Sequence, residues 1–540
     1  MSEGLAFDGG RYLYPSRRTV VYGSRGMVAT GQPLAAQAGL EMLKKGGNAI
    51  DAAVATAACL TVVEPTANGI GGDSFSLVWV KDRLYGLNAS GFSPKAVTPS
   101  VLTSAGLKEM PKHGWHSVTV PGAPSGWAAL SQKFGRLSLT EALRPAITYA
   151  ADGYPVSPTV SKLWKKALAD YAKELKGEEY RSWFETFCPD GKAPEVGETW
   201  SSKGHAETLA LIANTNAEAF YRGLLAEKID AYSKQYDGWL RASDLAEYWP
   251  QWVEPIGVNY RGYDVWEIPP NGHGITALMA LNILEAYDFS GSREREETYH
   301  RMIEALKLAF VDAQHHVADP RFMKHTAEEL LSKAYADERR KLMGNEAIDP
   351  APGTPPKGGT VYLAAADGEG NMISMIQSNY MGFGSGLVVP GTGIALHNRG
   401  NNFSLDPASS NILAPSKKPY HTIIPGFLSK NGKAVGPFGV MGGFMQPQGH
   451  VQVITNMVDF GMNPQEALDA PRWQWTKGKT ILLEQGVPNA IALSLAARGH
   501  DIQMLPDATS FGRGEIIVKT PHGSLAGGTE HRTDGSVATW

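Results

Sequence analysis

The sequence predicts one compact α/β protein, with a helix-rich N-terminal part and a strand-rich C-terminal part. Helical patterns dominate up to about residue 345, prolines and glycines crowd residues 345–359, and buried-strand patterns begin at Thr360. The 540 residues are 43% apolar and 19% charged, which supplies enough apolar side chains for a large core. Because no internal repeat divides the chain, we expect both parts to share one body.

Composition and charge exclude several classes of protein. A formal net charge of -4 argues against a nucleic-acid partner, since such proteins normally carry a basic excess. No apolar run has the 18 or so residues needed for a membrane span, and the opening residues lack the pattern of a secretory signal. Cys59 and Cys188 would allow one disulfide, but we interpret them as reduced thiols of a cytoplasmic protein.

The first elements follow from capping and periodicity. An amphipathic helix is predicted over residues 33–45, and a second over residues 48–62 with Asn48 as its N-cap. A glycine turn over residues 68–73 leads into a strand over residues 74–80, which pairs with another over residues 84–88. Glu64, Asn68 and Asp73 lie around this turn, and packing and turn formation explain them.

Later elements change from helical to extended. Residues 118–122 are expected to end a strand at a sharp turn, and residues 125–345 are mostly helical, most clearly over residues 296–315. The proline-rich segment 345–359 cannot continue a helix or lie inside a sheet, so we expect an exposed connector. The runs TVYLAAAD and MISMIQS that follow are apolar or small on both faces, as in strands covered from two sides.

A connector that ends in Gly358-Gly359 and runs directly into a buried strand suggests self-cleavage before Thr360. The threonine hydroxyl can attack the preceding carbonyl, and hydrolysis of the resulting ester frees the α-amine of Thr360 as a base for its own hydroxyl. Such an amine has a pKa of about 7.7–8.0, close to neutrality. The dipeptide alone would equally suit an ordinary glycine turn.

The wider context resembles the γ-glutamyltransferase (γ-glutamyltranspeptidase) family of N-terminal-nucleophile hydrolases. The similar segments include GNAIDAAVATAACLTVVEPTANGIGGDSF, VTVPGAPSGW, PPNGHGI, TVYLAAADGEGNMISMIQSNYMGFGSG, GTGIALHNRGNNFS, KPYHTIIP, GVMGGFMQPQGHVQV and MNPQEALDAPRW. The resemblance implies a four-layer αββα sandwich, with a large subunit of residues 1–359 and a small subunit of residues 360–540. It identifies Thr360 as the nucleophile and Gly359–Thr360 as the cleaved bond.

Further roles carry over position by position. Ser378 corresponds to the hydroxyl residue that poises the threonine nucleophile. The glycine loop 439–443 corresponds to the oxyanion hole, with Gly442 and Gly443 as donors, since glycine lets backbone N–H groups approach the tetrahedral oxygen closely. Alone, the loop could be an ordinary turn.

The substrate-binding positions depart from the family pattern. An arginine that clamps the substrate α-carboxylate is replaced by Ser90, and an asparagine by Tyr380. The other replacements are Asn402 for the acidic residue that holds the α-ammonium group, Arg399 for a glutamine, and His421 and Thr422 for paired serines.

These replacements change the charges of the predicted pocket. Asn402 cannot offset the desolvation of an ammonium group, whereas Arg399 can bind a carboxylate bidentately. We therefore expect an amide of a dicarboxylic acid without an α-amino group, such as a glutaryl-like or oxamate-like compound. His421 would serve equally well as a hydrogen-bonded structural residue, and Tyr380 as core packing.

The sequence thus predicts a self-cleaving amidohydrolase acting on a small carboxylate-bearing amide, with hydrolysis or transfer from an acyl-threonine intermediate. No metal or organic cofactor is expected, and the predicted assembly is a homodimer of processed heterodimers. Two alternatives stay open: a true glutathione hydrolase or transpeptidase, and an unprocessed homologue that only binds.

Overall fold

The computed structural model describes residues 17–350 and 359–540, and two seven-stranded sheets form its centre. In spatial order the first sheet contains β21 (Ser536–Thr539), β2 (Gly26–Thr30), β10 (Gly359–Asp367), β11 (Met372–Tyr380), β3 (Asp73–Val80), β4 (Arg83–Ala89) and β7 (Gln251–Val253). The second contains β1 (Val21–Gly23), β20 (Leu525–Thr529), β19 (Arg513–Lys519), β15 (Lys433–Met441), β14 (Gly426–Lys430), β9 (Tyr263–Glu267) and β8 (Ile256–Tyr260).

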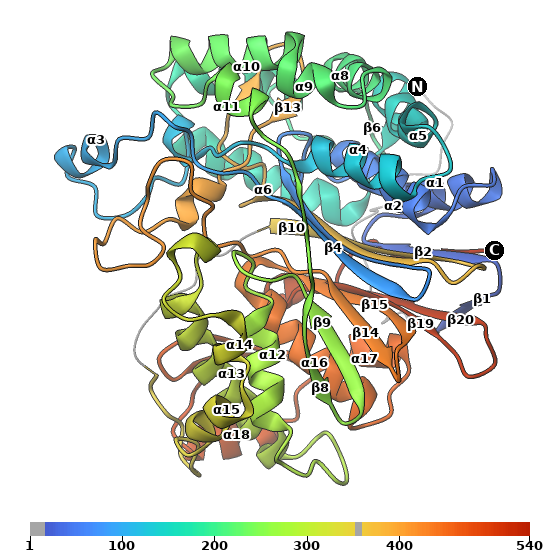
Figure 1. The fold of residues 1–540 in the computed structure, drawn as a ribbon, viewed down its shortest axis with the longest axis vertical. Coiled ribbons are helices and arrows are strands. Elements are labelled where there is room, and N and C mark those ends of the chain that lie inside the picture. Colours follow the sequence, from blue (N-terminus) through green and yellow to red (C-terminus); the bar gives the residue numbers. More distant parts are fainter. Residues whose placement is uncertain (1–16, 351–358) are drawn as a thin grey trace.

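Helices cover the outer face of each sheet, so the layers run helix, sheet, sheet, helix (Figure 1). The layer on the first sheet contains α1 (Pro33–Lys44), α2 (Ala49–Val63), α4 (Ala123–Phe134), α5 (Leu139–Asp152), α6 (Pro158–Glu174), α8 (Lys203–Asn214), α9 (Glu218–Arg222), α10 (Leu224–Gln235) and α11 (Ala242–Ala246). The layer on the second contains α12 (Ile275–Leu284), α13 (Glu296–His316), α14 (Ala327–Leu330), α15 (Lys333–Arg340), α16 (Gln446–Val458), α17 (Pro464–Asp469) and α18 (Asn489–Ala497). The four-layer sandwich is confirmed.

Smaller elements complete the chain. They are α3 (Pro99–Ser104), α7 (Arg181–Phe187), the strand pairs β5 (Tyr154–Pro155) with β6 (Thr199–Trp200) and β12 (Val388–Val389) with β13 (Ile394–Ala395), and the three-stranded sheet of β16 (Trp473–Lys477), β17 (Thr480–Glu484) and β18 (Asp501–Leu505). Single 3-10 turns are η1 (Trp115–Ser117), η2 (Glu178–Tyr180), η3 (Pro320–Phe322), η4 (Arg399–Asn402), η5 (Gly443–Met445) and η6 (Ala508–Phe511).

The helix α2 shows how local sequence and packing agree. The Asn48 side chain accepts hydrogen bonds from the backbone of Ile50 and Asp51, and the Asp51 carboxylate accepts one from the Asn48 N–H, which completes a capping box. Every residue of α2 is buried, because the helix lies between the first sheet and α5. The two helices and the strand pair predicted before residue 90 are confirmed.

One prediction of secondary structure is wrong. Residues 118–122 form no strand: the Val120 N–H donates to the Phe92 carbonyl and the Gly122 N–H to that of Gly72, so this extended segment makes single bonds instead of a ladder. The region 125–345 is mostly helical, as predicted, but β7, β8 and β9 also lie in it and extend the edges of both sheets. These strands have three to five residues each, and helical patterns surround them.

Both parts of the chain build both sheets. In the first sheet, β10 from the C-terminal part lies between β2 and β11, and β11 pairs with β3 from the N-terminal part. In the second, β9 pairs with β14. Most of the predicted connector, residues 351–358, lies outside the described residues.

Within the described ranges, none of the helices combines the length and apolarity needed to cross a membrane. Cys59 and Cys188 are both buried and both unpaired, so the two thiols form no disulfide with each other.

Candidate functional site

Thr360 lies beside the predicted hydroxyl partner. Its Oγ1 is 3.1 Å from the Oγ of Ser378 on the neighbouring strand, and the Thr360 side chain is buried. The strand register shifts here: Gly359 pairs with Tyr380 but Val361 pairs with Gln377, so Thr360 faces two residues of β11. Bulges of this kind re-aim side chains and are common next to active sites.

Two further groups surround this hydroxyl pair. The Tyr380 N–H donates to the Ser378 Oγ at 2.7 Å, and the Gln446 Nε2 lies 3.5 Å from the Thr360 Oγ1 as a donor. Gln446 is the first residue of α16, and its Oε1 accepts from the Ile424 N–H. The start of α16 is therefore fixed against the predicted nucleophile.

The register of the first sheet extends this group by one strand. Asp73 on β3 pairs directly with Ser378 on β11, so Thr360, Ser378 and Asp73 form a row across three strands. Side chains alternate between the faces of a strand, and Gln377 points to the opposite side, where its amide donates to the Ala57 carbonyl in α2. The row therefore faces the second sheet.

Arg399 lies in η4 and is completely buried. Its Nη1 donates to the Thr422 Oγ1 at 2.8 Å, its Nε is 3.6 Å from an Asp73 carboxylate oxygen, and its guanidinium lies 4.6 Å from the centre of the Tyr380 ring. Burial lowers the pKa of Arg399 to about 10, which keeps it charged at neutral pH. The structure thus brings together three of the predicted substrate-binding positions, Arg399, Tyr380 and Thr422.

Several buried polar atoms around Arg399 have no hydrogen-bond partner among the described residues. They are the Nε and Nη2 of Arg399, the hydroxyl of Tyr380, the Nδ2 of Asn402, both side-chain polar atoms of Asn379 and the Oδ1 of Asp73. Most of them are donors, and an unpaired buried donor is costly unless a ligand or water satisfies it. This chemistry suits an anionic group such as a carboxylate.

Asp73 is the acidic centre of the site. Its Oδ2 accepts from the His421 Nε2 at 2.9 Å and lies 3.7 Å from the His397 Nδ1. Burial opposes ionisation of Asp73, but His397, His421 and Arg399 outweigh it and hold its pKa below the ordinary value. Burial lowers the pKa of His421 to about 3, so this imidazole is neutral and donates from Nε2.

The glycine loop follows β15 and leads into α16. Gly442 has φ of +136° and Gly443 has φ of +60°, conformations that L-residues rarely adopt. A Cβ on Gly442 would lie 3.2 Å from the Gly512 Cα. Gln446, three residues after this loop, has its Nε2 3.5 Å from the Thr360 Oγ1, and the oxyanion role of Gly442 and Gly443 stays a prediction.

Ser90 belongs to a hydrogen-bonded network instead of a carboxylate clamp. Its Oγ donates to the Asn88 Oδ1 at 2.7 Å, and the same oxygen accepts from the Lys418 Nζ at 3.2 Å. Asn271 donates to Ser90 and to the Pro419 carbonyl. The groups at the position of the family's arginine are therefore bonded to one another.

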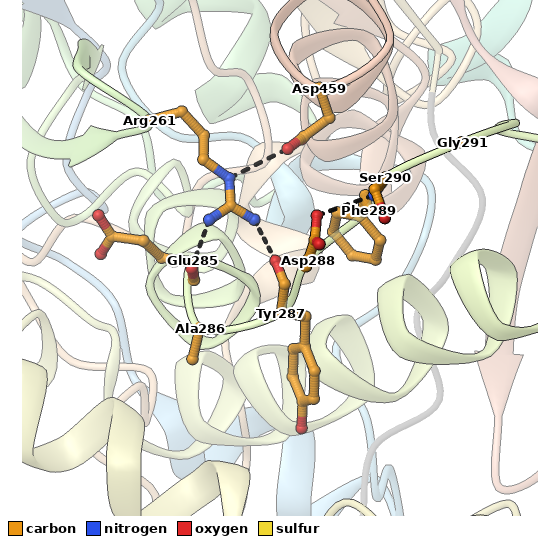
Figure 2. Close-up of a pocket in the computed structure, with 9 residues that line it drawn as sticks. All are labelled: Arg261, Glu285, Ala286, Tyr287, Asp288, Phe289, Ser290, Gly291 and Asp459. Atoms are coloured by element: carbon orange, nitrogen blue, oxygen red, sulfur yellow. Dashed lines mark hydrogen bonds and ion pairs between the residues drawn. The ribbon is translucent and has the colours of Figure 1, made fainter.

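A hollow of about 430 Å³ lies elsewhere (Figure 2). It is lined by Arg261, Asp459 and residues 285–291. The Arg261 guanidinium is engaged, because it donates to the Asp459 carboxylate and to the carbonyls of Glu285 and Tyr287. This hollow contains none of the predicted site residues and offers no free cation to an anionic substrate.

A second cluster has the residue types of a metal site. The ligand atoms of His300, Glu304 and His500 lie within 4.8 Å of one another. However, His300 donates from Nε2 to the Gly344 carbonyl and accepts at Nδ1 from the His500 Nε2, and the Lys307 ammonium lies 2.7 Å from Glu304. A lysine ammonium already occupies the place of a cation beside the carboxylate, which supports a structural role.

Comparison with known proteins identifies the family. The family model for gamma-glutamyltranspeptidase matches residues 35–540, and the chain belongs to this family. The crystal structure of a cephalosporin acylase from Bacillus halodurans matches with a TM-score of 0.96 and 58% identity over 99% of both chains. Among curated proteins, the glutathione hydrolase-like YwrD proenzyme of Bacillus subtilis is 39% identical over 96% of this chain and 99% of its own length. The acylase ACY 1 proenzyme of Pseudomonas sp. strain SE83 is 34% identical over 95% and 93%.

Sequence reasoning missed two residues of this site, Asp73 and Gln446. Asp73 was explained by packing and turn formation, but it begins β3 with its carboxylate facing His421 and Arg399. A carboxylate at the first position of an otherwise buried strand is a signal that could have indicated it. Gln446 lies in a segment that resembles the family and gave no separate signal.

Proposed function

We propose that the protein is a self-processing N-terminal-threonine amidohydrolase that acts on a small amide whose acyl group carries a carboxylate. The observation that carries the proposal is the Thr360–Ser378 hydroxyl pair at a strand bulge, next to a buried arginine with unpaired donor atoms. Membership of the gamma-glutamyltranspeptidase family and the likeness to acylases support the same reaction class.

The proposed processing step cuts the Gly359–Thr360 bond and yields subunits of residues 1–359 and 360–540. The Thr360 Oγ1 attacks the Gly359 carbonyl carbon, the C–N bond breaks as the nitrogen takes a proton, and water hydrolyses the ester. The released α-amine then acts as the general base for the same hydroxyl. The proenzyme names of the curated relatives support this step.

In the proposed reaction the Thr360 hydroxyl attacks the substrate amide carbonyl and its α-amine receives the proton. The N–H groups of Gly442 and Gly443 stabilise the oxyanion, while Arg399, Asn402 and Tyr380 bind the acyl carboxylate. The amine leaves with the proton, and water or an acceptor amine attacks the acyl-threonine ester. This chain's own residues supply the nucleophile, base and oxyanion donors.

We also propose a cytoplasmic location, which the unpaired Cys59 and Cys188 support, and a homodimer of processed heterodimers.

The first test is Thr360→Ala. We expect wild-type protein to separate on denaturing electrophoresis into two fragments, the smaller beginning at Thr360 by N-terminal sequencing, and the variant to stay intact and inactive. Thr30→Ala is the matched control, since Thr30 is a buried threonine of the adjacent strand β2 and donates to the Tyr362 carbonyl. An intact wild-type chain after long incubation would favour the binding homologue.

The second test compares a glutaryl anilide with a γ-glutamyl anilide, which differ only by the α-amino group. We expect a higher kcat/KM for the glutaryl compound, because Asn402 replaces the family's acidic residue and its amide cannot offset the desolvation of an ammonium group. Preference for the γ-glutamyl compound would instead indicate a glutathione hydrolase or transpeptidase.

A further inference from the structure

Asp73 connects side chains from separate segments of the site. The Asp73 Oδ2 accepts from the His421 Nε2 at 2.9 Å and lies 3.6 Å from the Arg399 Nε, and all three side chains are completely buried. Arg399 and His421 lie in the part of the chain after Thr360, whereas Asp73 lies in β3.

The remaining contacts of these partners fix their orientation. The Ile423 N–H donates to the His421 Nδ1, so the neutral imidazole carries its proton on Nε2 and points it at Asp73. The Arg399 Nη1 donates to the Thr422 Oγ1, and one face of the guanidinium lies against the Tyr380 ring. The Nη2 has no hydrogen-bond partner among the described residues. Asp73 therefore determines which edge of the guanidinium stays free.

We propose that Asp73 is a positioning residue of the acyl-binding pocket, whose carboxylate holds Arg399 and His421 in the places from which Arg399 receives the acyl carboxylate. This inference rests on the proposed function. Because Asp73 pairs with Ser378 in the strand register, it also sets the position of the pocket relative to the nucleophile. Specificity for a charged acyl group thus depends on a residue that does not contact the reacting atoms.

The test uses Asp73→Asn, which keeps an acceptor for His421 and removes the negative charge beside Arg399. Its substrates are glutaryl and pentanoyl anilides, which differ only by a terminal carboxylate against a methyl group. We expect the glutaryl-to-pentanoyl ratio of kcat/KM to fall by about ten-fold or more through a higher KM for the glutaryl compound. Any loss of kcat/KM for the pentanoyl compound should be smaller than the loss for the glutaryl compound.

A double-variant cycle separates positioning from other roles. If Asp73 acts through Arg399, then Asp73→Asn combined with Arg399→Met should lose no more discrimination than Arg399→Met alone. Equal losses on both substrates would overturn the inference and indicate a structural or catalytic role. A lower KM for the glutaryl compound would also overturn it, because Asp73 would then merely oppose anion binding.

One control variant and one structural measurement separate the possible outcomes. Asp51→Asn changes another buried carboxylate of the large-subunit part, one that accepts backbone hydrogen bonds from Arg136 and Leu137. We expect Asp51→Asn to lower Tm without changing the substrate ratio.

If wild type shows no preference for the glutaryl compound, the proposed function fails. A crystal structure of processed Asp73→Asn then decides the inference. We expect the Arg399 Nη1 to leave the Thr422 Oγ1, and an unmoved Arg399 would contradict the inference.

Discussion

At the scale of a single residue, Tyr380 contacts both Ser378, the partner of the predicted nucleophile, and Arg399, the proposed anion-binding residue. Its φ of +76° is unusual for a non-glycine residue and costs about 1–3 kcal/mol. In this conformation its N–H meets the Ser378 Oγ while its ring lies against the Arg399 guanidinium. The surrounding packing therefore maintains a strained backbone that links the nucleophile's partner to the anion-binding group.

Asn402→Asp should shift the substrate preference toward γ-glutamyl compounds. A carboxylate at this position would offer an ammonium partner beside Arg399, so we expect the γ-glutamyl-to-glutaryl ratio of kcat/KM to rise by about ten-fold. Steady-state assays with the two anilides measure this ratio.

Asn401→Asp provides the matched control for that substitution. It adds the same charge one residue earlier, where the Asn401 Nδ2 is already bonded to the Met110 carbonyl. A similar shift in both variants would mean that overall charge, and not the position of Asn402, causes it.

The residues that sequence reasoning found and missed differ in a physical way. Thr360 and Ser378 lie in segments that resemble the family, and the structure brings their hydroxyls together. The sequence shows Asp73 as a carboxylate at the start of a buried strand, but its partner His421 lies 348 residues further along the chain. Hydrogen bonds over such separations leave no local pattern in a sequence.

At the scale of elements, the strand β15, the turn η5 and the helix α16 form one strand–turn–helix unit whose first helical residue, Gln446, lies beside Thr360. The amino end of a helix carries partial positive charge, which favours a developing oxyanion. Gln446 then fixes the unit to the Thr360 hydroxyl.

Gly442→Ala should disturb this unit, because a Cβ is strained at φ +136° and would lie close to Gly512. We expect kcat to fall about 10²-fold or more, as when an oxyanion donor is lost, with little change in KM. Gly461→Ala is the control: it also has positive φ, but it follows α16 and has open space around its Cβ position. Equal losses of kcat in both would contradict the oxyanion role.

Elements with strong local signals were predicted well. The capping residues Gln32 and Asn48 fix the starts of α1 and α2, and both helices lie where the sequence indicated. The short strands β7, β8 and β9 were missed because tertiary pairing with β4 and β14 stabilises them.

At the scale of the whole molecule, buried histidines and buried carboxyl groups change the stability of the fold in opposite directions as the pH falls. Burial lowers the pKa to about 3 for each of four histidines, listed as His273, His421, His450 and His500. The unfolded chain therefore binds more protons below pH 6.5, and these groups reduce stability on acidification. Burial raises the pKa of Glu64, Glu267 and Glu515, which acts in the opposite direction.

Glu64→Gln tests how one buried carboxyl group contributes to the pH dependence of the free energy of unfolding. Burial raises the pKa of Glu64 from 4.5 to about 7 despite its ion pair with Arg513. The folded protein thus retains a proton that the unfolded chain releases, and this contribution to stability is present below pH 4.5 and lost as the pH rises through 7. The free energy of unfolding of the variant relative to wild type should increase by about 3 kcal/mol between pH 4.5 and pH 8, measured by urea denaturation. A constant difference between Glu64→Gln and wild type across the same pH range would mean that Glu64 is ionised throughout.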